Sequence, residues 1–197
     1  MYSCSIVTLK SANIGSLLSC VGNSMPFRKP NKNCDEASLY DYAIGALARR
    51  MHSVAELKRK LRTRCPEESM IDSVVVRLKQ QKYLNDASFA AAYAGFRRDN
   101  ENFGRRRVVT DLKVKGVHAD VIEKAVDEAY SGANEEELAR AFLRRKRLKK
   151  PGSNKEAARI FRALMRAGFG VATSIKVLKS WSVDDEVLTA LQEEPEP

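Results

Sequence analysis

Clusters of arginine and lysine are the residues of this sequence with the clearest chemical potential, because closely spaced cations bind phosphate and carboxylate groups. The densest cluster lies in residues 140–150 and comprises Arg140, Arg144, Arg145, Lys146, Arg147, Lys149 and Lys150. On a helix, Arg140, Arg144 and Arg147 would lie on one side, at spacing i, i+4 and i+7. We therefore expect this cluster to contact a polyanion.

Three smaller clusters differ in how well they suit the helices predicted around them. Arg97 and Arg98 fall at a predicted helix end, where cations suit the helix dipole, so a purely local role competes with a binding role. Three consecutive arginines near a predicted helix start are Arg105, Arg106 and Arg107. Cations oppose the dipole at a helix start, which favours a phosphate or carboxylate partner. A fourth basic face comprises Lys58, Arg59, Lys60, Arg62 and Arg64.

Side chains that support catalysis or metal binding are sparse. The two histidines have no nearby ligand partner, and the four cysteines are spaced too widely for a C-x₂-C metal knuckle. The sequence also lacks a phosphate-cradling glycine loop and a nucleophile elbow. We therefore expect no enzymatic activity, no cofactor and no metal. We expect the cysteines to be free thiols in a reducing cytoplasm.

The charge of the chain is large and unevenly distributed. The net charge is +10 over 197 residues. Residues 1–34 carry four cations and no acid, and residues 183–197 carry six acids and no cation, which leaves +12 in 35–182. No apolar run approaches the roughly 18 residues of a membrane-spanning helix. A body this basic favours a nucleic acid over a membrane as its partner.

Helix signals recur from residue 35 onward. Ser53 and Glu56 form a capping box, in which each side chain is expected to bind the other residue's backbone amide. Gly116 and Gly168 have the position of glycines that end helices. No segment alternates with period two, so the sequence predicts an all-α protein. Aromatic side chains expected to be packed are Tyr83, Phe89, Tyr93, Phe96 and Trp181.

Three helical segments align with one another at spacings of 51 and 52 residues. They are Glu56-Leu57-x₃-Leu61-x₃-Cys65, Arg107-Val108-x₃-Leu112-x₃-Gly116 and Arg159-Ile160-x₃-Leu164-x₃-Gly168. A further helical stretch precedes each of them. The pattern predicts three tandem three-helix repeats that form an elongated, curved body. The predicted parts are a basic, disordered extension 1–34, repeats 35–84, 85–133 and 134–182, and an acidic tail 183–197.

These repeats resemble the RecX family of regulatory proteins, which modulate the RecA recombinase filament. Four stretches carry the resemblance: Ala46-Leu47-x₂-Arg50-x₂-Ser53-x₂-Glu56-Leu57-x₂-Lys60-Leu61, Tyr83-Leu84-Asn85-Asp86-x₂-Phe89-Ala90-x₂-Tyr93-x₃-Arg97, Gly104-x₂-Arg107-Val108-x₃-Leu112-x₂-Lys115-Gly116-Val117 and Arg159-Ile160-x₃-Leu164-x₃-Gly168-Phe169. The resemblance implies a non-catalytic monomer that binds the RecA filament and its single- and double-stranded DNA. It further implies inhibition of RecA ATPase, strand exchange and co-protease function. The clustered cations at 97–98, 105–107 and 140–150 are then the candidate contacts.

Other interpretations remain open at this stage. Tandem three-helix units can resemble helix-turn-helix modules, so a DNA-binding protein that acts without RecA is the main alternative. A helical scaffold for an unrelated protein is another. The acidic tail is either a solvated terminus or a segment that screens the basic body, and Met25 offers a second translation start.

Overall fold

The computed structural model describes residues 35–193, and all regular structure in this range is α-helical. The predicted extension 1–34 and the possible start at Met25 lie outside the described residues. The helices are α1 (Glu36–Arg49), α2 (Val54–Arg62), α3 (Glu68–Gln80), α4 (Asp86–Asp99), α5 (Arg105–Val114), α6 (Ala119–Tyr130), α7 (Glu135–Arg145), α8 (Asn154–Arg166), α9 (Val171–Lys179) and α10 (Asp185–Glu193). The predicted all-α class is confirmed.

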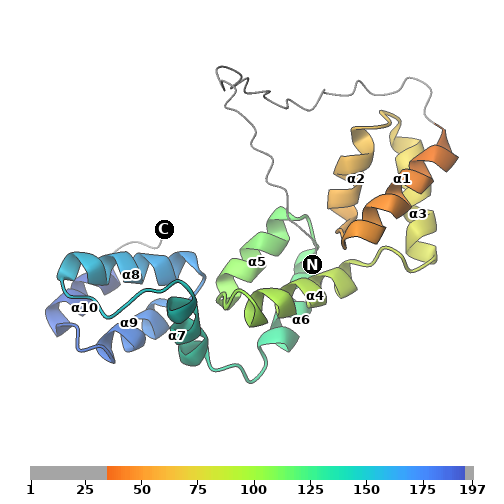
Figure 1. The fold of residues 1–197 in the computed structure, drawn as a ribbon. Helices are drawn as coiled ribbons and strands as arrows, with labels where there is room; N and C mark the ends of the chain where they lie inside the picture. The colour runs from red at the N-terminus through yellow and green to blue at the C-terminus, as the bar shows by residue number, and fades with distance from the viewer. Residues whose placement is uncertain (1–34, 194–197) are drawn as a thin grey trace, which may run out of the picture.

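The helices form three successive units, each with its own hydrophobic core. The first unit comprises α1–α3, the second α4–α6 and the third α7–α10. Figure 1 shows these units one after another along an elongated, curved body. The prediction of three tandem three-helix repeats is therefore confirmed, with one additional helix in the third unit.

That additional helix, α10, lies within the segment expected to be an acidic tail. Leu188 and Leu191 are buried in the core of the third unit, with 4% of each residue exposed. They are three positions apart, so they share one helix face, and this apolar face holds the acidic segment against α8 and α9. The acids of the segment therefore belong in part to a packed helix.

Polar side chains fix where several helices begin. Asp35, Ser53, Asn85, Asn134 and Ser153 each accept a backbone hydrogen bond from the first turn of the helix that follows. The first half of the predicted capping box is confirmed, because the Glu56 amide donates to Ser53 Oγ over 3.0 Å. The second half is wrong, since the Glu56 carboxylate binds cations at the boundary between two units.

Three sequence expectations about side-chain environment also need correction. Tyr83 is 60% exposed and Phe96 is 55% exposed, so neither is a core residue. Phe89 and Tyr93 are packed in the second core, whereas Phe96 is not part of it. Cys65 is fully buried and disulfide-bonded, so the expectation of a free thiol is wrong at this position.

The second helices of the three units, α2, α5 and α8, follow one another head to tail (Figure 1). We call the contact between the first two units the first joint and that between the last two the second joint. At the second joint, the Gly104 amide donates to the Ala167 carbonyl over 2.8 Å, and the Arg106 amide donates to the Gly168 carbonyl over 3.3 Å. The free amides at the start of α5 thus satisfy free carbonyls at the end of α8.

Glycine is required for this close approach. Gly168 has φ of 90°, a left-handed conformation that few other residues adopt. A Cβ on Gly104 would lie 2.3 Å from the Gly168 carbonyl oxygen. The second joint therefore holds two helix ends in direct backbone contact.

Candidate functional site

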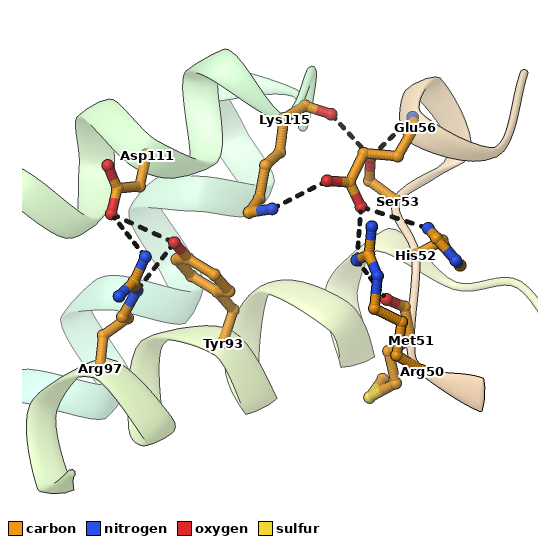
Figure 2. A network of polar contacts seen from close by, with 9 residues as sticks. All are labelled: Arg50, Met51, His52, Ser53, Glu56, Tyr93, Arg97, Asp111 and Lys115. Atoms are coloured by element: carbon orange, nitrogen blue, oxygen red, sulfur yellow. Dashed lines mark hydrogen bonds and ion pairs between the residues drawn. The ribbon is translucent and has the colours of Figure 1, made fainter. Parts of the chain in front are cut away.

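The first joint is built from side chains and centres on Glu56 (Figure 2). Ser53 Oγ, while capping α2, donates to the Lys115 carbonyl at the end of α5 over 2.6 Å. Lys115 Nζ donates to Glu56 Oε1 over 2.8 Å, and Arg50 donates to Glu56 Oε2 over 3.3 Å. The joint therefore combines a helix cap with an ion pair between two units.

Two titratable groups at this joint have displaced pKa values. Burial tends to raise the pKa of Glu56, but the hydrogen bond and charge of Lys115, together with Arg50, lower it overall. Burial lowers the pKa of His52 below its ordinary value of 6.5, and the charges of Arg50 and Lys60 add to this effect. His52 Nδ1 lies 3.6 Å from Glu56 Oε2 and has no hydrogen-bond partner. His52 is therefore a buried side chain at the boundary between units, and its surroundings favour the neutral form.

The predicted pair Arg97 and Arg98 has structural partners within the second unit. Arg97 donates to Tyr93 Oη over 2.8 Å and lies 3.3 Å from Asp111 Oδ2, so it links α4 to α5 (Figure 2). Arg98 pairs with Asp99 over 2.6 Å and donates to the Ala129 carbonyl on α6. Both guanidinium groups therefore hold the second unit together.

The predicted triplet at 105–107 begins α5, as expected. Arg105 pairs with Asp127 of α6, and Arg107 pairs with Asp111 over 3.1 Å. Arg106 contributes its backbone amide to the second joint, and its side chain is exposed. Cations at this unfavourable end of a helix are thus partly balanced by carboxylates of the same unit.

The densest cluster divides into paired and exposed members. Arg140 pairs with Glu136 over 3.3 Å, and Arg145 pairs with Glu101 across the second joint over 2.5 Å. The hydrogen bond from Arg145 lowers the pKa of Glu101. Five exposed cations form no ion pair with any residue in 35–193: Arg144, Lys146, Arg147, Lys149 and Lys150.

The expected alignment of Arg140, Arg144 and Arg147 on one helix side is wrong for Arg147. Helix α7 ends at Arg145, and Arg147 has φ of 54°. The Leu148 amide donates to the Leu143 carbonyl over 2.9 Å, which reverses the chain at this point. Arg147 and the two lysines after it therefore project from a loop.

Sequence reasoning missed two groups of residues. One is the network of the first joint. Ser53 and Gly104 occupy aligned positions at the starts of successive second helices, and this alignment is the signal in the sequence that points to the joints. The other is a set of exposed cations on α5 and α8 outside the predicted clusters: Lys113, Lys155, Arg159, Arg162 and Arg166. A helical projection of the aligned repeats would have found these cations.

Residues 35–193 contain no candidate for two other kinds of site. No group of three or more His, Cys, Asp or Glu side chains in this range could hold a metal ion. No helix in the same range is long and apolar enough to cross a membrane.

Two of the three units match models of a known protein family. The family model described as "RecX, first three-helix domain" matches residues 40–78, and the one described as "RecX, second three-helix domain" matches residues 85–126. These ranges fall within the first and second units.

Individual relatives in sequence, and the solved structures with a similar fold, are RecX proteins as well. The chain is 35% identical over 147 residues to a regulatory protein RecX from Leptothrix cholodnii, covering 75% of this chain and 91% of the relative. It is 34% identical over 133 residues to one from Geobacillus thermodenitrificans, covering 66% of this chain and 49% of that longer protein. The fold is similar to the crystal structure of RecX from Lactobacillus salivarius, with a TM-score of 0.62, 18% identity, and coverage of 75% of this chain and 96% of that one. A second RecX crystal structure gives a TM-score of 0.63 at 20% identity, covering 74% of this chain and 73% of that one.

Proposed function

The chain belongs to the RecX family of regulatory proteins, and from this premise we propose that it is a non-catalytic inhibitor of the RecA–DNA filament. It would lower RecA ATPase, strand exchange and co-protease activity, and so modulate DNA repair, recombination and the SOS response in the cytoplasm. RecA and the single- or double-stranded DNA it coats are the proposed partners, and the protein acts as a monomer without a cofactor or a membrane.

One observation carries this proposal: three helical units, of which the first and the third are net basic, are joined into one elongated, curved body (Figure 1). Linked units that each make weak contacts gain affinity, because the second and third contacts form at high effective concentration. A repetitive partner such as a nucleoprotein filament offers equivalent contacts at regular intervals. A compact partner offers only one.

The candidate contacts differ in how free they are to bind. Those at 97–98 and 105–107 are largely engaged within the second unit, so their first role is to shape it. The exposed cations in the last turn of α7 and in the loop after it have no ion pair with any described residue to lose, and binding them to a phosphate or carboxylate costs only their hydration and mobility. We therefore rank Arg144, Lys146, Arg147, Lys149 and Lys150 ahead of the other candidates.

The main alternative is a helix-turn-helix protein that acts without RecA. Such modules insert their last helix into the DNA major groove. In the second unit that helix is α6, whose charged residues are Asp120, Glu123, Lys124, Asp127 and Glu128. An acidic α6 would be repelled by DNA, so the charge of the second unit disfavours this docking mode.

The decisive experiment measures RecA ATPase on single-stranded DNA while the full-length protein is titrated. We expect ATP hydrolysis to fall as the protein saturates the filament. A variant with Arg144→Gln, Lys146→Gln and Lys149→Gln should require more protein for the same inhibition. A rate that stays unchanged up to saturating amounts of the natural protein would overturn the proposal.

A further inference from the structure

The exposed side of the second helices carries cations in all three units. At about 100° per residue, these positions lie opposite the buried leucine and isoleucine positions that face each core. The cations are Arg59 and Arg62 on α2, Arg106 and Lys113 on α5, and Lys155, Arg159, Arg162 and Arg166 on α8. All eight are exposed, and we call them the basic stripe.

The acids of these three helices do not oppose the stripe. Glu56 binds Lys115 in the first joint, and Asp111 binds Arg107 and Arg97. Glu156 accepts the Gly152 amide over 2.8 Å beside the start of α8. Each carboxylate is therefore engaged in a cap, a joint or a contact within its unit. Of the stripe itself, Arg62 also pairs with Glu68 of α3 over 2.5 Å.

The two joints bring together the helices that carry the stripe. Helix α5 begins where α8 ends, and it ends where α2 begins, so the three helices follow one another along the body (Figure 1). The helices have 9, 10 and 13 residues, which corresponds to about 50 Å of helix at roughly 1.5 Å per residue. No single helix in residues 35–193 could present charge over this length.

Several of the remaining helices carry acids. The first turn of α7 holds Glu135, Glu136 and Glu137, α6 is acidic, and α10 begins with Asp185 and Glu186. Helices α6 and α10 are therefore more acidic than the second helices, whereas α9 carries Lys176 and Lys179 and no acid. A polyanion that approached from the side of the second helices would meet mainly positive charge.

We propose that the basic stripe binds the phosphate backbone of one nucleic-acid strand, with the strand running along α2, α5 and α8. This inference rests on the proposed function, because it assigns the DNA contact of the same filament complex. A strand of about 50 Å carries about 15 phosphates at roughly 3.4 Å per phosphate. Five of the stripe cations, Arg59, Lys113, Lys155, Arg159 and Arg166, can neutralise about a third of them. Six of the eight are arginines, whose planar guanidinium groups bind phosphate oxygens in pairs.

The test removes one stripe cation from each unit. The stripe variant is Arg59→Gln, Lys113→Gln and Arg159→Gln, three residues that form no ion pair with any described side chain. The control variant is Lys79→Gln, Lys124→Gln and Lys176→Gln, which removes three exposed cations from the third helices α3, α6 and α9. Both variants lose the same charge from the same three units.

The measurement is binding of the full-length proteins to a single-stranded oligonucleotide across a salt series, without RecA. Each neutralised phosphate contributes roughly 0.7 to the slope of log affinity against log salt. We expect the stripe variant to lose about 2 from that slope, while the control variant keeps the slope of the natural protein. Equal losses in both variants would show that only net charge matters and would overturn the inference.

A parallel titration of RecA ATPase separates this inference from the proposed function. If the stripe variant keeps its DNA affinity but loses inhibition, the stripe contacts an acidic surface of RecA, and the phosphate assignment is wrong. If the natural protein binds DNA through the stripe but never inhibits RecA, the phosphate assignment stands and the proposed function fails.

Discussion

Replacing Gly104 by alanine should open the second joint. The φ of Gly104 is −71°, which alanine adopts without strain, so backbone conformation is not the obstacle. The obstacle is space, because the new Cβ would lie 2.3 Å from the Gly168 oxygen and 2.4 Å from its carbonyl carbon. Both atoms belong to the backbone and cannot rotate away, so the start of α5 must leave the end of α8.

The cost follows from the contacts that this separation breaks. Two backbone hydrogen bonds cross the joint, and each contributes about 0.5–1.5 kcal/mol. The rings of Phe103 and Phe142, 6.0 Å apart, add about 0.5–1.5 kcal/mol. We therefore expect Gly104→Ala to reduce the free energy that stabilises the third unit against the second by about 1.5–4.5 kcal/mol.

Trp181 provides the assay, because it is the only tryptophan of the chain and packs against the core of the third unit. Its fluorescence during urea unfolding should show an earlier midpoint in the Gly104→Ala protein, and small-angle X-ray scattering should show a changed overall shape. Gly95→Ala is the matched control, since Gly95 lies inside α4 and nothing lies within 4 Å of its added Cβ. That change should stabilise α4 by about 0.5–1 kcal/mol. An unchanged midpoint and shape for Gly104→Ala would refute this account of the joint.

Two further predictions concern the first joint. Ser53→Ala should cost more stability than Ser153→Ala. Both changes remove a helix cap that contributes about 1 kcal/mol, but only Ser53 also binds Lys115 across two units. Equal losses of stability in urea unfolding would contradict this role of Ser53. Stability should also fall as the pH drops below 6.5, because the lowered pKa of His52 means that the unfolded chain takes up the proton more readily than the folded one. His52→Phe should remove that part of the pH dependence of stability, measured by urea unfolding. Phenylalanine is the residue at the equivalent position before α5, Phe103. A pH dependence that stays the same in this variant would exclude His52 as its source.

Much of the fold could be predicted from the sequence because it depends on local signals. Buried positions recur at helical spacing, and caps such as Ser53 mark helix starts. The position of Arg147 could not be predicted in this way. It occupies a left-handed position that glycine usually fills, and a run of cations carries no apolar pattern to show where the helix stops.

The candidate site was less accessible to sequence reasoning, because its pairings join distant residues. Arg105 meets Asp127 and Arg145 meets Glu101 only after the helices have packed. Charge density correctly identified a basic protein but could not separate cations that are internally paired from cations that are exposed. The order of the second helices along the body could not be predicted either, because it depends on which helix ends meet at the two joints.

Because α5 takes part in both joints, its length sets the angular phase between the outer units. Each added residue turns a helix by about 100° and lengthens it by about 1.5 Å. One insertion in α5 would therefore rotate the first unit by more than a quarter turn relative to the third and carry Arg59 out of line with Arg159. An insertion near Gly132, in the loop between α6 and α7, would leave this phase unchanged, because both joints are made elsewhere. The ten residues of α5 thus act as a phase-setting spacer for the whole molecule.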